Sequence, residues 1–533
     1  MYGAAWESVR VSFPHLHHDF AQRLPELGIP RHVQETPAPR LCFLNEPLAR
    51  DLGLDPDWLR TETGLRFLTG QQLPETARPV AMAYAGHQFG GYSPLLGDGR
   101  ALLLGELAVP GPEDSEDDGA EDDGAGGVVR PTPAQLRDLH LKGSGTTPFT
   151  RPGADGQAVL APMLREALIG ESLHALGIPS TRALAVVSTG RPVIRERPLP
   201  GAVLVRVAAS HLRVGTFQLA RQVGVQEPSE AGSADWPVLR RLTDCALQRH
   251  FPETLPAENP ACALFEQVVA VQARLVAQWM LVGFVHGVMN TDNMAISGQS
   301  LDFGPCAFID AYSADAVFSS IDRQGRYRLG NQPAAAQWGL ARFGEALLPL
   351  LASDPQEAAA SAEGALAGFS REYDAAWQLG LARKLGLAPG EHAPRAEVVA
   401  LGERLLELMA ARSADWTSLF RRLGRVLSED AAEAAQVRRE LAEEGFDSWV
   451  RDWLSHAPDR AQMDAVNPVV IPRNHLVEEA LAAAHTGELG LFEALMARLR
   501  DPFAEGISGR VESRRYAEPA PAEAGPYVTW CGT

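Results

Sequence analysis

The sequence predicts an α+β protein in which a small strand-rich part precedes a larger helical part. Runs typical of β-strands occupy residues 100–107, 136–142 and 202–207. From about residue 215 onward the chain is Ala- and Leu-rich, and its apolar residues recur mostly at helical spacing. With 533 residues, 45% of them hydrophobic, the chain can bury a large core in two or three structural units, which excludes a peptide or a globally disordered protein.

We expect four regions along the chain. The first mixes short apolar runs with prolines and is expected to pack on a larger body. The second holds the predicted strands and a helix that Pro162 opens and Gly177 closes. The expected boundaries are an N-terminal extension at 1–75, a strand-rich lobe at 76–205, a helical lobe at 206–400, and a C-terminal helical region and tail at 401–533.

The chain is acidic overall. It has 48 Lys and Arg against 67 Asp and Glu, a net charge of −19, so no overall basic surface is available to bind nucleic acid or an anionic membrane. Eight acidic residues lie in a Gly- and Asp-rich run at about 111–127. Such a run repels itself and has nothing apolar to bury, so we expect a disordered insertion in the strand-rich lobe. A calcium loop is the alternative, although the ordered ligand spacing is missing.

Cysteine usage and hydropathy bear on location. The first thirteen residues lack an apolar run, so no signal peptide is expected. The longest apolar stretch, 264–284, is interrupted by polar residues and is better explained by a buried helix than by a membrane span. The spacing of the cysteines contains no CxxC pair and no zinc pattern, which favours a cytoplasmic location. The five cysteines are Cys42, Cys245, Cys262, Cys306 and Cys531.

Lysine is rare in this chain. Lys142 and Lys384 are the two lysines among 48 basic residues. Where Arg is otherwise used, a Lys is expected to sit where a compact ammonium is needed. Neither follows the glycine spacing of a Walker A loop, which excludes that class of nucleotide site.

The segment His286–Asn293 (HGVMNTDN), followed by Leu301–Gly304 (LDFG), is the most informative in the chain. In protein kinases a His is followed seven residues later by an Asn and then by a DFG, and the Asn and the Asp hold magnesium. The same pattern predicts Asn293 and Asp302 as ligands of Mg²⁺ or Mn²⁺.

The kinase proton acceptor is missing from this pattern. Val288 stands where kinases have the catalytic Asp. Asp292 directly precedes the predicted metal-binding Asn, so a carboxylate remains that could act as the base. A plain Asx-rich loop is the alternative interpretation of this segment.

Upstream residues fit a kinase-like nucleotide site. Lys142 follows Leu139 and Leu141 on a predicted strand whose alternation turns the Lys away from the apolar face. Glu166, on the next predicted helix, could hold that Lys as in kinases. The turn Gly97–Arg100 could bring backbone close to phosphates. Each feature alone also fits a simple turn or an exposed ion pair, but the order of all of them favours a nucleotide site.

Several long segments resemble the selenoprotein O family of kinase-like protein adenylyltransferases. The resemblance runs from LNEPLA at 44–49 to the C-terminus and includes NPVVIPRNHL at 467–476. The other segments are YAGHQFG (84–90), LGDGRALLLGE (96–106), LKGSG (141–145), RVAASHLRVGTF (206–217), HGVMNTDNM (286–294) and LDFGP (301–305).

The resemblance implies a protein-kinase-like bilobal fold that binds ATP in a flipped pose and transfers AMP to Ser, Thr or Tyr hydroxyls of proteins, including itself. It implies Asp292 as proton acceptor, Asn293 and Asp302 as metal ligands, and Glu166 as the ion-pair partner of Lys142. Cys531 stands where some members carry selenocysteine, and either a regulatory disulfide or a free thiol is possible there. The implied nucleotide contacts are Gly97, Gly99, Arg100, Lys142, Asp155, Gly156, Arg206, Arg213 and Asp302.

Two other functions stay open at this point. The same lobes could transfer the γ-phosphoryl group, which the missing acceptor at Val288 argues against. A pseudokinase scaffold could bind ATP without catalysis, and Asp292 would then be dispensable. The expected partners are ATP and protein substrates, with no nucleic acid and no membrane.

Overall fold

The computed structural model describes residues 13–109, 131–225, 235–388, 394–505, 514–521, 523 and 525–529. The predicted acidic insertion at about 111–127 and Cys531 lie outside the described residues, so the expectations about them stay predictions. The chain divides into two compact units: unit 1 comprises Met1–Ala83, Gly97–Leu160 and Ala183–Ala209, and unit 2 comprises Tyr84–Leu96, Ala161–Arg182 and Ser210–Thr533.

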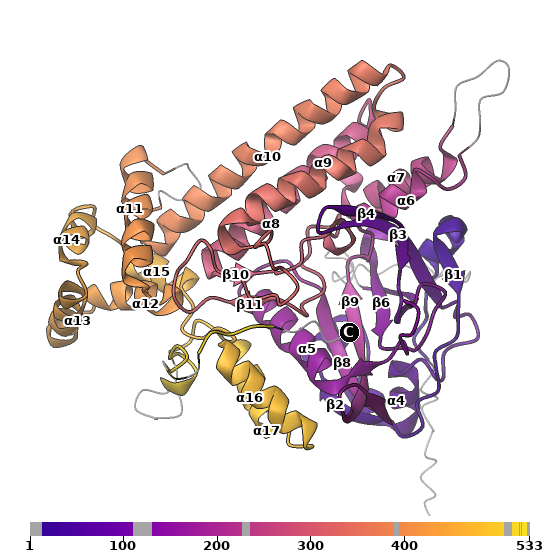
Figure 1. Cartoon of the computed structure of the whole chain (residues 1–533), viewed down its shortest axis with the longest axis horizontal. Coiled ribbons are helices and arrows are strands. Elements are labelled where there is room, and N and C mark those ends of the chain that lie inside the picture. Colours follow the sequence, from indigo (N-terminus) through magenta and orange to yellow (C-terminus); the bar gives the residue numbers. More distant parts are fainter. Residues whose placement is uncertain are drawn as a thin grey trace, which may run out of the picture. The chain divides into compact units, whose positions relative to one another are not determined.

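A largely antiparallel sheet dominates the N-terminal part of the chain (Figure 1). Within the described residues nine strands form it, in the order β1-β3-β5-β6-β9-β8-β2, with β4 paired to β3 and β7 paired to β9. The strands are β1 (Gly28–Pro30), β2 (Arg40–Leu44), β3 (Val80–Gln88), β4 (Gly91–Gly97), β5 (Ala101–Ala108), β6 (Leu136–Lys142), β7 (Ala158–Val159), β8 (Arg182–Ile194) and β9 (Pro198–Ala208).

The three strands predicted from the sequence are present as β5, β6 and β9, and β6 lies between the other two. Lys142, at the end of β6, is opposite Ala101 of β5 and Leu204 of β9. Leu139 and Leu141 belong to the apolar core. Because strand side chains alternate between faces, His140 and Lys142 lie together on the other face of β6.

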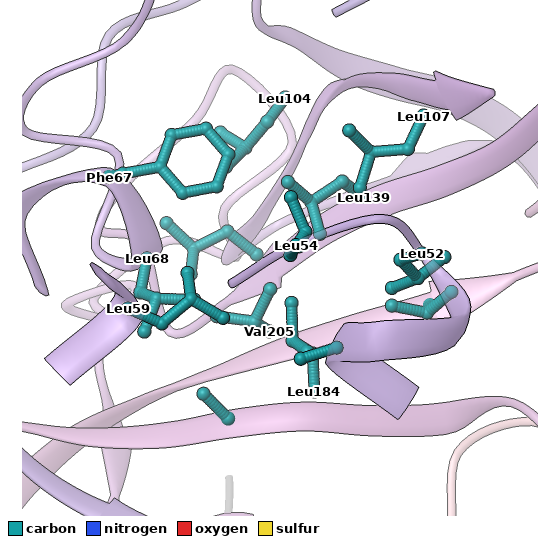
Figure 2. Packing of buried hydrophobic residues seen from close by; sticks show 14 of the residues in the cluster. Leu52, Leu54, Leu59, Phe67, Leu68, Leu104, Leu107, Leu139, Leu184 and Val205 are labelled. Carbon is teal, nitrogen blue, oxygen red and sulfur yellow. The ribbon is translucent and has the colours of Figure 1, made fainter. Parts of the chain in front are cut away.

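Short helices near the N-terminus complete the core of unit 1. Figure 2 shows Leu59, Phe67 and Leu68 packed with leucines of the sheet. Each such side chain removed from water contributes about 1.5–3 kcal/mol to stability. The helical segments here are α1 (Asp19–Arg23), η1 (Pro25–Leu27), α2 (Glu46–Asp51), α3 (Pro56–Arg60), α4 (Glu62–Leu68) and η2 (Pro133–Gln135).

Unit 2 is largely helical, and its helices α8, α9 and α10 lie side by side (Figure 1). The helix predicted to open at Pro162 is present as α5. The helices are α5 (Leu160–Ala175), α6 (Val214–Ala220), α7 (Pro237–His250), α8 (Pro260–Val282), α9 (Gln332–Leu351), α10 (Pro355–Lys384), α11 (Ala396–Arg412), α12 (Trp416–Val426), α13 (Ala431–Glu443), α14 (Asp447–Ser455), α15 (Arg460–Val466), α16 (Asn474–His485) and α17 (Gly490–Leu499), with short turns η3 (Pro252–Thr254), η4 (Thr291–Asn293) and η5 (Leu329–Asn331).

Helix α8 leads directly into the segment that the sequence singles out. The side chain of Asn259 caps its first turn, and Gly283 ends it with φ +70°, a conformation that favours glycine. The next residues form β10 (Phe284–Val285), which pairs antiparallel with β11 (Ala307–Phe308). The loop 286–306 therefore leaves and returns at one two-stranded ribbon, which fixes both of its ends.

Helix α8 is also the one helix in the described part of the chain that is long and apolar enough to cross a membrane, judged by length and composition alone. Its apolar window has a hydropathy of 1.2, and 56% of that window is buried inside the protein. This is weak evidence for a span, because a buried core helix has the same properties.

A second apolar core holds the C-terminal part of unit 2 together. It joins Val285 and Ile309 beside the ribbon to Leu381 of α10, Trp416 of α12 and Trp453 of α14. The structure confirms an α+β protein with an N-terminal antiparallel sheet and a largely helical C-terminal part. The four region boundaries stay predictions.

Candidate active site

Asp292 lies in a short turn of the loop between β10 and β11. The turn, η4, follows Asn290, whose carbonyl accepts the backbone N–H of Asn293 at 2.9 Å. Burial raises the pKa of the Asp292 carboxyl, and a hydrogen bond from Gln88 partly offsets this. A buried carboxyl with a raised pKa binds a proton more readily than an exposed one, as a general base requires.

Arg213 connects Asp292 to Asp302. It is the N-cap residue of α6, and its Nη1 donates to the carbonyl oxygen of Asp292 at 3.0 Å. The same atom lies 3.7 Å from Oδ2 of Asp302. Its guanidinium also lies over the ring of Tyr84, 4.5 Å from the centroid. The structure thus brings four predicted site residues together in unit 2: Arg213, Asp292, Asn293 and Asp302.

Asp302 has an unusual backbone. Its φ is +64°, in the left-handed region that non-glycine residues rarely occupy. It is one of four non-glycine residues with positive φ in the described residues. Strained residues of this kind persist only where the surrounding structure holds them, and they cluster at functional sites.

The donor set here suits a hard divalent cation. Asn293 uses its amide Nδ2 to donate to the Val288 carbonyl at 3.1 Å, so its Oδ1 is the atom that could bind a cation. Asp302 adds a carboxylate. The described residues contain no group of three or more His, Cys, Asp and Glu that could hold a metal by themselves. Mg²⁺ commonly binds through one or two protein oxygens plus substrate phosphates, so Asn293 and Asp302 fit it.

Hydrogen bonds connect the end of β3 to the loop that holds Asp292. The backbone N–H of His87 donates to Thr291 Oγ1 at 2.7 Å, and that of Phe89 donates to Asn290 Oδ1 at 3.0 Å. Between them, Nε2 of Gln88 donates to Oδ2 of Asp292 at 3.0 Å. Three consecutive residues of β3 and its turn thus hold three consecutive residues of the loop.

In unit 1 the predicted Gly-Asp-Gly turn is a tight one. Gly97 has φ +146°, and an added Cβ would lie 2.4 Å from the ring of Phe149. A Cβ at Gly99 would lie 3.0 Å from the carbonyl oxygen of Phe149. Asp98 is buried and accepts the backbone N–H of Met82 at 3.2 Å. Glycine is therefore needed at 97 because of Phe149, and the expected approach of this turn to phosphates stays a prediction.

Lys142 and Arg206 share one face of the sheet. Arg206 of β9 is opposite His140 of β6, and its Nη2 lies 3.3 Å from Nδ1 of that histidine. Nε2 of His140 in turn lies 2.9 Å from Oδ2 of Asp98. Arg206, His140 and Lys142 are all buried. The backbone of Arg100 joins this group, since its carbonyl accepts the N–H of Gly143 at 2.7 Å.

Three further predicted site residues are Asp155, Gly156 and Glu166. Asp155 forms an ion pair with Arg195 at 2.8 Å, which lowers the pKa of that carboxyl. Gly156 has φ +66° and packs tightly against Gly145. Glu166 is buried on α5. Lys142 belongs to unit 1 and Glu166 to unit 2, so the predicted ion pair between them stays a prediction.

Reasoning from the sequence missed several residues of the site. Gln88 and Thr291 lie inside segments already singled out, 84–90 and 286–294, but neither received a role. His140 was also missed, although a strand places it on the same face as Lys142 two residues later. The signal for Gln88 would have been the two polar side chains, His87 and Gln88, that end a mostly apolar strand.

Comparison with known proteins assigns the family. A sequence model described as "Protein adenylyltransferase SelO" matches residues 16–117 and 123–500. The chain belongs to this family. It is 53% identical over 516 residues to proteins named "Protein nucleotidyltransferase YdiU" from Pseudarthrobacter chlorophenolicus and Mycolicibacterium paratuberculosis, covering 96% of this chain and 97% of each relative. It is 51% identical to a protein of the same name from Cereibacter sphaeroides, over 93% of this chain and 95% of that relative.

Membership of the SelO family confirms the resemblance stated from the motifs and the predicted enzyme class, a protein nucleotidyltransferase. It also implies ATP as the co-substrate and proteins as acceptors. The roles of individual residues and the metal ion are not assigned by these comparisons.

Proposed function

We propose that this chain transfers AMP from ATP to Ser, Thr or Tyr hydroxyls of proteins, itself included, within a protein-kinase-like bilobal fold that binds ATP in a flipped pose. One observation carries the residue assignment. Asp292 is buried, and its Oδ1 has no hydrogen-bond partner among the described residues, while Arg213 links its backbone to Asp302. A carboxylate oxygen kept dry and unpaired is suited to accept a proton from an incoming hydroxyl.

The reaction assigns a role to each part of the site. The acceptor oxygen attacks the α-phosphorus, its proton passes to Asp292, and pyrophosphate leaves with the electron pair of the broken P–O bond. Asn293 and Asp302 would hold Mg²⁺ or Mn²⁺, which supplies charge neutralisation to the phosphates. We assign nucleotide contacts to Gly97, Gly99, Arg100, Lys142, Asp155, Gly156, Arg206 and Arg213, with Glu166 orienting Lys142.

Preorganised cations are the main requirement of such a transfer. Phosphoryl chemistry needs positioning and charge stabilisation more than covalent help. Arg213 and Arg206 are both buried and hydrogen-bonded, so little reorganisation is needed when charge develops. We also propose a cytoplasmic enzyme that acts on neither nucleic acid nor membranes.

The test uses ATP labelled at either the α- or the γ-phosphate, with Mg²⁺ and then with Mn²⁺. Label should reach protein from the α position only, and Asp302→Ala and Asp292→Ala should abolish it. Asp244→Ala, on the exposed side of α7, is the matched control and should retain transfer. Transfer from the γ position would make the chain a kinase, and ATP binding without any transfer would make it a scaffold.

A further inference from the structure

The two carboxylate oxygens of Asp292 have different surroundings. Oδ2 accepts the amide of Gln88 at 3.0 Å, whereas Oδ1 is buried without a partner among the described residues. Oδ1 lies close to position 86, which is a glycine. A Cβ at Gly86 would lie 2.9 Å from Oδ1 and 3.1 Å from the Cβ of Asp292. Oδ2 is therefore held by an amide, while Oδ1 is enclosed beside Gly86.

Gln88 is itself fixed from both sides. Its neighbours His87 and Phe89 donate their backbone N–H groups to Thr291 and Asn290 of the same loop, at 2.7 Å and 3.0 Å. Thr291 further donates to Gln218 of α6 at 2.8 Å, and the amide of Gln218 reaches Nδ1 of His87 at 2.9 Å. The amide of Gln88 is thus presented by a rigid backbone, as a positioning group requires.

The chemistry of an amide suits this place. A neutral donor orients a carboxylate without adding a charge that would hold it ionised, as an Arg or Lys would. With Oδ2 accepting the amide hydrogen, the carboxylate is fixed in one orientation.

We propose that Gln88 is a positioning residue for the reaction: its amide holds Oδ2 and so fixes the orientation of the Asp292 carboxylate that accepts the hydroxyl proton. This rests on the proposed function. In the step concerned, the hydroxyl proton moves to the carboxylate of Asp292 while the hydroxyl oxygen bonds to the α-phosphorus, and the bond from that phosphorus to pyrophosphate breaks. Gln88 exchanges no proton and contacts no substrate.

The experiment compares wild type with Gln88→Met, which keeps the length of the side chain and removes its donor. ATP labelled at the α-phosphate is the probe, with the chain itself and α-casein as acceptors. The rate constant of transfer at saturating ATP should fall about 10- to 100-fold, because a misdirected base loses its near-attack geometry. The dissociation constant for ATP, measured by calorimetry, should change less than twofold.

Two further variants sharpen the test. Gln436→Met is the matched control, because Gln436 of α13 also donates its amide to a carboxylate, that of Glu440, at 3.0 Å but on the exposed surface. It should leave the rate unchanged. Gln88→Glu has the shape of Gln without the amide donor and should lower the rate as well, which keeps the test valid if the Met variant folds poorly.

The outcomes separate the two proposals. A rate within twofold of wild type in Gln88→Met, or a loss of rate in both Gln88 variants that is matched by a lower melting temperature or weaker ATP binding, would overturn the positioning role. If wild type transfers no α-label to either acceptor, the proposed function itself fails, and the positioning proposal falls with it. A selective loss of rate in folded variants that bind ATP normally supports it.

Discussion

At the scale of single residues, the site depends on backbone conformations that side chains do not favour. Asp302 is held at φ +64°, which costs a non-glycine residue about 1–2 kcal/mol. Its carboxylate lies 3.7 Å from Nη1 of Arg213, and Leu301, next to it, accepts from buried His286 at 2.9 Å. The loop thus keeps a strained residue because its neighbours fix it.

This strain can be measured by comparing Asp302→Gly with Asp302→Ala. Both variants lack the carboxylate and should lose transfer of α-label. Since glycine adopts positive φ without penalty, the Gly variant should be more stable than the Ala variant by about 1 kcal/mol in urea unfolding. Equal stabilities would show that position 302 relaxes to an ordinary conformation once the carboxylate is gone.

Gly97 in unit 1 also has a positive φ, which a side chain does not favour. In Gly97→Ala, the positive φ and a Cβ 2.4 Å from the Phe149 ring should together cost about 2 kcal/mol or more. The control is Gly364→Ala in α10, where an added Cβ meets nothing within 4 Å; it should stabilise the helix by about 0.5–1 kcal/mol. Differential scanning calorimetry should show a lower melting temperature for Gly97→Ala and a higher one for Gly364→Ala.

At the scale of elements, one arginine joins several segments of unit 2. Arg165 of α5 is buried and donates to the carbonyl of Cys306, just after the Asp-Phe-Gly segment, at 2.6 Å. It also lies 3.2 Å from Glu478 of α16, whose carboxylate accepts the hydroxyl of Tyr527 at 2.6 Å. Nearby, Thr529 Oγ1 donates to the Pro305 carbonyl at 2.9 Å. Helix α5, the C-terminal tail and the segment after Asp302 are thus tied together.

Arg165→Ala should therefore destabilise the chain by about 1–3 kcal/mol, because it leaves a buried carbonyl without its donor. Hydrogen exchange should rise in residues 303–308 and 525–529 together. Arg274→Ala removes an exposed pair with Glu372 of α10 and should cost less than about 1 kcal/mol. Unchanged exchange in the tail would show that Arg165 acts on α5 alone.

At the scale of the whole molecule, a buried lysine links global stability to pH. Lys384, at the end of α10, is buried, and burial lowers its pKa to about 7. Its Nζ lies 4.2 Å from the ring centroid of Phe420 and 5.7 Å from that of Trp416, and these rings offset part of the cost of a buried charge. The core of unit 2 therefore carries an amine that titrates near neutrality.

Proton linkage decides whether the stability of the folded chain rises or falls with pH. The folded pKa lies below the ordinary value of 10.5, so the unfolded chain binds this proton more tightly, and stability rises as pH rises from about 7 to 10.5. The full interval is worth up to about 5 kcal/mol. Lys384→Met should be more stable than wild type at pH 7 and should lose this rise between pH 7 and 9, measured by urea unfolding.

Arg371→Met, which removes an exposed cation from the same helix, should leave the pH slope unchanged. If the free energy of unfolding changed with pH equally in wild type and Lys384→Met, a neutral, buried amine would be contradicted. Lysine rarity pointed to a special place for both lysines, and the structure puts this one in the core of unit 2 rather than beside the loop of Asp292.

Short segments of the sequence were enough to predict several features of this protein. Alternation in 136–142 predicted β6, because a strand with one apolar face has a period of two. Spacing in 286–304 predicted Asn293 and Asp302 as metal ligands, which stays a prediction, and the ribbon of β10 and β11 fixes both ends of the loop that holds them. The family, the enzyme class and the α+β fold were all predictable from such segments.

Only the tertiary structure decided which distant side chains share a hydrogen bond. That Gln88 meets Asp292, 204 positions later, depends on how unit 2 folds, and no local periodicity encodes a contact between such distant segments. The same holds for Arg213 beside Asp302 and for Lys384 among aromatic rings. The sequence by itself determined the family and the segments that hold the candidate site, because residue types and spacing are local; the fold determined how each side chain is oriented, because orientation depends on contacts made across the chain.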